Sequence, residues 1–411
     1  MVSARLCTFI GAAAAIAGIT VFVRPAPVAF AGQAPTASAR KSPARTTTRA
    51  LRTPWGDPDL QGIWTNEFDI PLQRPARYGN REFLTDEERA DLDKQRAALL
   101  GRDRRVERGT ELDVAGAYNA LFMLIKRTGR RTSLVVDPPD GRIPPTTPEA
   151  RQRAAADREF RLALLQSTET CRNKSVGCAG GKYDPAPSPR RAELPPRYNT
   201  GRMNRFDNPE DGALADRCLA DNGGGLPVFG SAFGGSFRRI VQTPGGITIY
   251  YDHGQGQGFQ RNIVMNGSPH LPASIRQWYG DSRGRWEGDA LVVDVANFSP
   301  KVEFMGSREN LHLVERWKRT GPDTLEYSVT IDDPTVWTRP WTAKEEFTKQ
   351  SEKENRIYYE PRCHEGNYAF ASMLRAARLA DKAYAEGRGP HPATKDNATD
   401  FVGVEENPLA R

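Results

Sequence analysis

Apolar and polar residues alternate along the chain from about residue 237 to residue 360. This period of two is typical of strands that bury one face and expose the other. Turn sequences such as PGG at 244–246 and GPD at 321–323 separate neighbouring runs. Strands joined in this way predict an antiparallel meander that forms a barrel or a sandwich. The predicted strands are 238–242, 247–251, 260–265, 276–279, 290–296, 312–319, 324–331, 341–348 and 356–360.

Helical patterns lie on both sides of this region. Thr85 and Glu88 form a capping box that opens a helix over 85–100. Thr147 and Pro148 open another helix that ends near residue 166, because proline is favoured in a first helical turn. We predict a mainly β, α+β fold with a helical N-terminal part. Three further helices are expected over 109–127, 211–220 and 368–385.

The N-terminus reads as a secretory signal peptide over residues 1–31. Arg5 precedes an apolar run at 6–23, and Ala-Phe-Ala at 29–31 matches the small residues of a cleavage site. A retained membrane anchor is the alternative, but the run is short and Arg24 follows it. We therefore predict a secreted or periplasmic protein that is cleaved near Ala31 and has no stable membrane anchor.

The rest of the chain divides by composition into four predicted segments. They are a disordered linker at 32–53, a helical and loop-rich region at 54–236 packed on the barrel, a β-barrel domain with its C-terminal helix at 237–385, and a flexible tail at 386–411.

Composition and charge exclude several classes of protein. Only 38% of the 411 residues are hydrophobic, which suffices for one core of ordinary size. Removing the signal peptide leaves 56 basic and 51 acidic residues, and the basic runs contain acidic residues. A nucleic-acid partner is therefore not expected. The sequence also lacks GxxxxGK[ST], HExxH and paired CxxC motifs.

Four cysteines remain in the mature chain, and an even number in an oxidising compartment suggests two disulfides. The favoured pairing is Cys171 with Cys178 across a short loop, and Cys218 with Cys363. The other two pairings stay open. A Cys/His metal site is a weaker alternative because neither pair has the usual spacing.

Several blocks are similar to those of a widespread family of secreted bacterial proteins, over roughly residues 54–379. The blocks are PWGDPDLQGIW at 54–64, DPPDGRIP at 137–144, IRQW at 275–278, GDSRGRWEGD at 280–289, DDP at 332–334, WTRPW at 337–341 and CHEGNY at 363–368. This resemblance implies export but no particular activity. The family commonly carries His-Asp where this chain has Asp252-His253. Separately, Gly62-x-Trp64 ahead of a meander resembles the first barrel strand of lipocalins. This resemblance implies a lipocalin-like barrel that binds a ligand.

Histidine is scarce, and four of the five lie in the predicted meander half: His253, His270, His312 and His364. Imidazole suits proton transfer near neutral pH. His364 is the favoured base because Glu365 follows it and could orient it. The alternative is that each histidine forms only local hydrogen bonds. His270, between two prolines, looks like a turn residue.

The segment at 281–286 combines an acid, a hydroxyl, two guanidinium groups and an indole. Asp281 with Arg276 or Arg285 would bind the polar end of a substrate, since Arg suits carboxylate or enolate oxygens. The alternative is a hairpin turn with Arg stacked on Trp. Six aromatic residues could line an apolar pocket, although large aromatics equally form core: Trp278, Trp286, Trp337, Trp341, Tyr359 and Tyr368.

These residues suggest an enzyme that acts on a small, partly apolar molecule by proton transfer, of the lyase or isomerase type. No cofactor is required. The first alternative is a lipocalin-like protein that binds a ligand without reaction. A metal-dependent hydrolase or oxygenase is the second, with His312 or His253 joining His364 and Glu365. A structural envelope protein is the third, and the oligomeric state is open. An enzyme should place ionisable groups at the bottom of the pocket, whereas a carrier should line the pocket with apolar groups and keep the charges at its rim.

Overall fold

The computed structural model describes residues 51–99, 126–197, 203–219, 225–229, 237–252, 258–354 and 368–398. Several predictions fall outside these ranges. They are the signal peptide, most of the linker, nearly all of the helix over 109–127, the strand over 356–360 and the last part of the tail.

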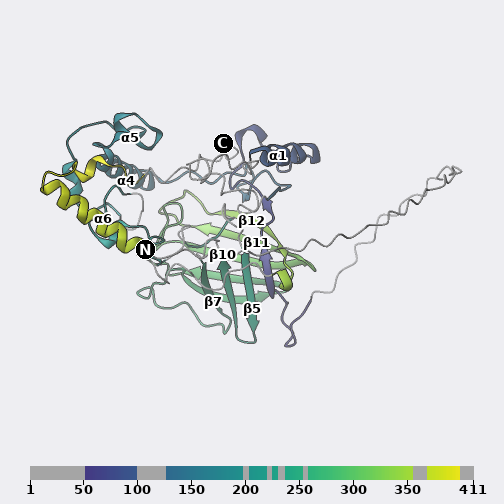
Figure 1. Cartoon of the computed structure of the whole chain (residues 1–411). Coiled ribbons are helices and arrows are strands. Elements are labelled where there is room, and N and C mark those ends of the chain that lie inside the picture. Colours follow the sequence, from purple (N-terminus) through teal and green to yellow (C-terminus); the bar gives the residue numbers. More distant parts are fainter. Residues whose placement is uncertain are drawn as a thin grey trace, which may run out of the picture. The chain divides into compact units, whose positions relative to one another are not determined.

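Nine strands form a closed β-barrel (Figure 1). The first strand closes it, because β1 pairs with β5 on one edge and with β12 on the other, where Trp64 lies opposite Lys349. This confirms the mainly β fold and its barrel form, and it places Gly62 and Trp64 in a barrel strand. In order around the barrel the strands are β1 (Gly62–Thr65), β5 (Phe237–Thr243), β6 (Gly246–Asp252), β7 (Gly258–Val264), β8 (Asp281–Glu287), β9 (Ala290–Ala296), β10 (His312–Gly321), β11 (Thr324–Asp332) and β12 (Trp341–Lys349).

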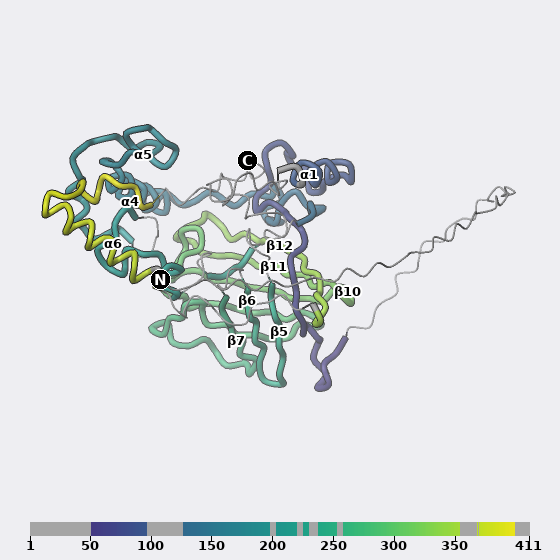
Figure 2. The backbone as a smooth tube through the Cα atoms, viewed as in Figure 1, coloured from purple at the N-terminus to yellow at the C-terminus, as the bar shows by residue number. Residues whose placement is uncertain are grey.

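Three short strands lie outside this ring. β4 (Val135–Asp137) extends the sheet by pairing with the beginning of β12. β2 (Phe68–Asp69) and β3 (Arg127–Thr128) form a separate parallel pair. Figure 2 follows the backbone from the purple N-terminal strand through teal β5 to yellow-green β12.

The prediction of a wholly antiparallel meander is wrong at one place, because β7 and β8 pair in parallel. Parallel strands begin at the same end of a sheet. Residues 265–280, here called the crossover segment, must therefore carry the chain from the end of β7 back to the end at which β7 begins. The predicted strand at 276–279 is only an isolated bridge between Gln277 and Phe298. The following residues, one interpretation of which was a hairpin turn, form β8 instead.

Gly284 explains why β8 is hard to recognise. It occupies an inward position, where a Cβ atom would lie 2.7 Å from Cγ2 of Ile263 on the neighbouring strand. Close packing of β7 on β8 thus requires glycine where an alternating strand would normally carry an apolar residue. The period of two is interrupted in the sequence although the strand is regular.

The barrel encloses the main hydrophobic core. Along each strand alternate side chains point inward, as Leu313 and Trp317 do on β10 and Leu325 and Val329 do on β11. All four are essentially inaccessible to solvent. The strand parity read from the sequence is therefore confirmed for these strands, and it fixes which residues face the interior.

The predicted helices at both ends of the described chain are confirmed. α1 (Asp86–Leu99) begins with the expected capping box, in which Thr85 N donates to Glu88 Oε2 (2.8 Å) and Glu88 N to Thr85 Oγ1 (3.2 Å). α4 (Pro148–Leu165) is capped by Thr147, whose Oγ1 accepts from Ala150 N (3.1 Å). α6 covers Tyr368–Ala385. The remaining helices are α5 (Glu169–Arg172) and the 3-10 turns η1 (Ala76–Tyr78), η2 (Val176–Cys178), η3 (Pro189–Ala192), η4 (Pro209–Asp211), η5 (Glu352–Glu354) and η6 (Pro392–Thr394).

The structure differs from the sequence-based expectation at two further segments. The helix expected over 211–220 is replaced by η4 and a series of turns as far as residue 219. Residues 386–398, assigned to the flexible tail, contain η6 and are tied to the α4–α5 region. Ser167 Oγ donates to the carbonyl of Ala393 (2.9 Å), and Asn397 N donates to Asn204 Oδ1 (2.8 Å).

The disulfide between Cys171 and Cys178 is present as predicted. Cys218 is also disulfide-bonded, and its predicted partner Cys363 lies outside the described residues.

In the part of the chain that the structure describes, no helix combines the length and the apolar character needed to span a bilayer.

Candidate functional site

Two polar clusters lie on opposite sides of the barrel wall. The first, here called the outer network, consists of His270, Asp281, Arg283, Asp294 and His312. On β8, the inward positions are held by Ser282, Gly284 and Trp286, so the alternating residues face outward. The outer network therefore lies on the outer face of β8, β9 and β10, where the crossover segment passes.

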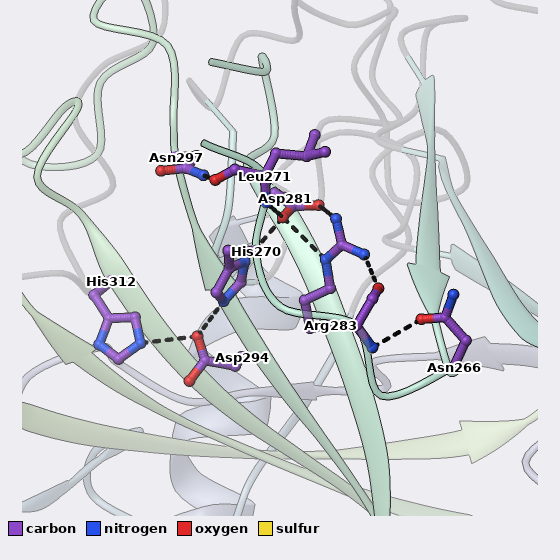
Figure 3. A network of polar contacts seen from close by, with 9 residues as sticks. Asn266, His270, Leu271, Asp281, Arg283, Asp294, Asn297 and His312 are labelled. Atoms are coloured by element: carbon purple, nitrogen blue, oxygen red, sulfur yellow. Dashed lines mark hydrogen bonds and ion pairs between the residues drawn. The ribbon is translucent and has the colours of Figure 1, made fainter. Parts of the chain in front are cut away.

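His270 connects two carboxylates in the outer network (Figure 3). Its Nδ1 lies 2.9 Å from Asp281 Oδ2, and its Nε2 lies 2.8 Å from Asp294 Oδ1. The Nε2 of His312 lies 3.0 Å from the same Asp294 oxygen. Because ionised carboxylates only accept hydrogen bonds, both bonds of His270 form together when each ring nitrogen carries a proton.

The carboxylates of the outer network are held in their charged forms. Burial alone would raise the pKa of Asp281, but hydrogen bonds from Arg283, the Leu271 amide and His270 outweigh it and lower that pKa. Burial would also raise the pKa of Asp294, but hydrogen bonds from His270 and His312 outweigh this effect and lower that pKa.

The outer network fastens the crossover segment to the barrel wall. Besides His270, Arg283 donates through Nη1 to Ser268 Oγ (2.6 Å), and Asn297 Nδ2 donates to the carbonyl of Leu271 (2.7 Å). Both ring nitrogens of His270 are engaged with carboxylates. This arrangement suits a structural tether better than a general base.

The second cluster, here called the inner cluster, consists of Tyr251, Arg261, Glu315, Trp317 and Tyr327. These residues occupy inward positions on β6, β7, β10 and β11, and each is at most 3% exposed. Arg261 binds Glu315 with both terminal nitrogens, at 3.2 Å and 2.5 Å. Tyr327 Oη donates to Glu315 Oε1 (2.9 Å). An ion pair and two phenols are thus enclosed in the barrel.

Three donors of the inner cluster have no hydrogen-bond acceptor among the described residues. They are the hydroxyl of Tyr251, the Nε of Arg261 and the indole Nε1 of Trp317. Buried polar groups are nearly always hydrogen-bonded, so each exception requires an explanation. Aromatic rings surround these donors, since Tyr251 stacks on Phe259 (4.7 Å between centroids) and Trp317 packs against Tyr327 (4.2 Å).

The electrostatics of the inner cluster keep its donors protonated. Burial raises the pKa of Tyr251 to about 12 and raises that of Tyr327 well above its ordinary value, with the Glu315 charge acting in the same direction. Burial disfavours the charged form of Arg261, but Glu315 and the neighbouring phenols outweigh it and raise the pKa of Arg261.

A further group of polar side chains continues from Tyr251 towards β12. The guanidinium of Arg238 lies 5.6 Å from the Tyr251 ring centroid and 3.8 Å from Glu345, to which Asn66 Nδ2 also donates. Burial lowers the pKa of Lys126, although the nearby Glu345 charge opposes this shift. Buried charged groups therefore continue from the inner cluster towards β12.

Of the predicted catalytic residues, Asp281 and His312 come together through His270 and Asp294. They lie on the outer face of the barrel and not in its interior. The reason is strand parity, since both alternate with core residues. Arg276 donates instead to the carbonyl of Glu309 (2.7 Å), and Arg285 pairs with Glu287 (2.7 Å) on the exposed face of β8.

The described members of the predicted aromatic pocket lie in different parts of the structure. Trp337 and Trp341 are core residues that pack edge to face at 5.7 Å. Trp286 packs against the core, and Trp278 is half-buried in the crossover segment. Tyr368 is 79% exposed at the start of α6. The predicted residues His253, His364, Glu365 and Tyr359 lie outside the described residues.

Sequence reasoning missed the inner cluster, although a signal was present. Arg261 has the same strand parity as Phe259 and Ile263, and Glu315 has the same parity as Leu313 and Trp317. A charged residue at an apolar position of an alternating strand indicates a buried charge, which requires a partner. Arg261 on β7 and Glu315 on β10 carry opposite charges at inward positions, so each is the expected partner of the other.

Within the described ranges, no group of three His, Cys, Asp or Glu side chains is placed to hold a metal ion. Comparison with known proteins adds no identity: neither a family model nor a curated protein matches this sequence.

Proposed function

We propose that this protein binds a small, partly apolar molecule inside its nine-stranded barrel. The observation that carries the proposal is the inner cluster, in which buried donors without an acceptor among the described residues lie beside apolar core residues. Ligand sites typically combine apolar linings with a few well-placed polar groups. Barrels of about eight strands already hold one small ligand in some families.

The energetic cost of the inner cluster supports this proposal. An unsatisfied buried donor costs about 1–3 kcal/mol, and a buried ion pair is often no more stable than apolar residues of the same volume. The Arg261–Glu315 pair and the neighbouring donors without acceptors therefore stabilise the barrel less than apolar side chains of the same volume would. A ligand that accepts hydrogen bonds would offset that cost when bound.

Acid–base conversion of the bound molecule is the second candidate function, of the lyase or isomerase type. It is favoured by the position of the ionisable groups, which face the interior of the barrel instead of only its rim. Lys126 adds an amine whose pKa is lowered by burial, which suits proton transfer. His364 with Glu365, and His253, stay proposed members of such a site.

We also propose that the protein is exported to the periplasm or the exterior. The signal-like N-terminus supports this, and the Cys171–Cys178 disulfide is consistent with an oxidising compartment. The similarity of its sequence blocks to secreted bacterial proteins is part of the same proposal.

Native mass spectrometry of the mature protein, followed by solvent extraction, tests the binding function. We expect one small molecule per chain that is released on denaturation, or uptake of one molecule from a panel of apolar acids, alcohols and amides. Incubation should leave the ligand unchanged for a carrier, and should isomerise it or change it by one water for the proposed enzyme. Absence of any bound molecule in both arms would contradict the proposal.

A further inference from the structure

We infer, on the basis of the proposed binding function, that the ligand is a small apolar carboxylic acid whose carboxylate accepts hydrogen bonds from the inner cluster. The three donors without an acceptor among the described residues are Tyr251 Oη, Arg261 Nε and Trp317 Nε1. Indole and guanidinium groups only donate. The open positions of the inner cluster therefore call for a ligand that brings acceptor atoms.

The acceptors of the inner cluster are already engaged. Glu315 accepts two bonds from Arg261 and one from Tyr327. A ligand that mainly donates, such as an amine, would compete with these bonds and leave the three donors as they are. A carboxylate, with two oxygens and about four lone-pair sites, can accept from all of them.

The aromatic rings beside the three donors indicate the chemical character of the part of the ligand that is attached to the carboxylate. Phe259 lies between Tyr251 and Tyr279, with ring centroids 4.7 Å and 3.7 Å away, both stacked. Trp317 lies against Tyr327 and Phe347. Such surroundings favour an apolar body attached to the carboxylate.

Calorimetric titration with matched probes tests this inference. The probes are straight-chain carboxylic acids from acetate to dodecanoate, phenylacetate and 3-phenylpropanoate, each with the alcohol of the same skeleton. We expect the best acid to bind about tenfold or more tightly than its alcohol. Tyr251→Phe and Trp317→Phe should each reduce this preference severalfold, because each removes one donor.

Tyr250→Phe is the matched control, since it removes the same hydroxyl one residue along β6, on the outer face. It should leave the preference unchanged. Urea unfolding of each variant identifies one that fails to fold, in which case the other donor variant decides.

The outcomes separate the two proposals. Binding of acids and alcohols with equal affinity would overturn the carboxylate inference and leave the binding function standing. An acid preference that neither Tyr251→Phe nor Trp317→Phe reduces would also overturn it, because the acid then binds elsewhere. If no probe binds and no ligand is extracted from the purified protein, the proposed function fails as well.

Discussion

At the scale of single residues, Glu315 organises the inner cluster. It is fully buried and accepts hydrogen bonds from Arg261 and Tyr327. Its strand neighbours Leu313 and Trp317 show that the position belongs to the core. A charge at such a position requires a partner of opposite charge, which Arg261 supplies.

Breaking the buried pair on one side should strongly destabilise the protein. Glu315→Leu leaves Arg261 charged without a partner, and we expect a loss of about 3–5 kcal/mol in the free energy of unfolding. Combining it with Arg261→Met should recover most of that loss. Urea unfolding of both single variants and the double variant measures the coupling. Additive losses in the double variant would show that the two side chains do not interact.

The two buried phenols should respond differently to loss of their hydroxyls. Tyr327→Phe removes a hydrogen bond to a charged acceptor, and we expect a cost of about 1.5–3 kcal/mol. Tyr251→Phe removes a buried hydroxyl without an acceptor among the described residues, and we expect it to raise the free energy of unfolding by about 1 kcal/mol because the cost of burying that group is lost. Urea unfolding of the ligand-free protein gives both values. Equal costs would indicate that Tyr251 has a partner in the folded protein.

Residue identity alone predicted some residues of the two polar clusters and missed others. Asp281 and His312 were singled out as candidate site residues, but His270, which connects Asp281 to Asp294, was interpreted as a turn residue. Its location between two carboxylates depends on the crossover segment, which no local pattern predicts. The inner cluster could have been found from strand parity, as Arg261 and Glu315 show.

At the scale of elements, the crossover segment is the feature that distinguishes this sheet from a simple meander. It makes β7 and β8 parallel, and the outer network fastens it through His270. The sequence predicts most antiparallel strands because their turns and alternation are local. It does not predict the crossover, because parallel pairing is decided by packing between distant segments.

The tether of the crossover segment should weaken in acid. The pKa values of Asp281 and Asp294 are lowered in the folded protein. Their stabilising effect is therefore complete above the unfolded-state value of about 3.9 and is lost as the pH falls through the lower folded-state values. We expect Asp281→Asn to be less stable than the wild type near neutral pH, with a difference that shrinks below about pH 4.

Urea unfolding from neutral pH to about pH 3 measures this difference. Asp323→Asn, an exposed carboxylate in the β10–β11 turn, serves as the control and should show no such trend. A constant difference between Asp281→Asn and the wild type at all pH values would show that the charge of Asp281 is not what fastens the segment.

Gly284 should be required for the close packing of β7 on β8. A Cβ atom there would clash with Met265 Sδ and would lie 2.7 Å from Ile263 Cγ2. We expect Gly284→Ala to cost about 1–3 kcal/mol through overpacking. Gly245→Ala in the β5–β6 turn, where no atom lies within 4 Å, is the matched control and should be close to neutral. A neutral Gly284→Ala would mean that β8 is held less tightly than described.

At the scale of the whole molecule, closure of the barrel depends on a strand far upstream. β1 lies about 170 residues before β5, yet it joins β5 to β12. Local patterns predicted a mainly β fold with three correctly placed helices, while the choice between barrel and sandwich was open. Closure depends on long-range pairing of Trp64 with Arg238 and Lys349, which hydrophobic periodicity alone cannot specify.

The interior of the barrel, at the inner cluster, is the proposed binding site. A crystal structure of the protein with the tightest acid of the probe series tests it most directly. We predict that the acid lies inside the barrel with a carboxylate oxygen within hydrogen-bonding distance of Tyr251 Oη or Trp317 Nε1. An acid bound on the outer face, or an interior filled only by water bridging those donors, would contradict the account.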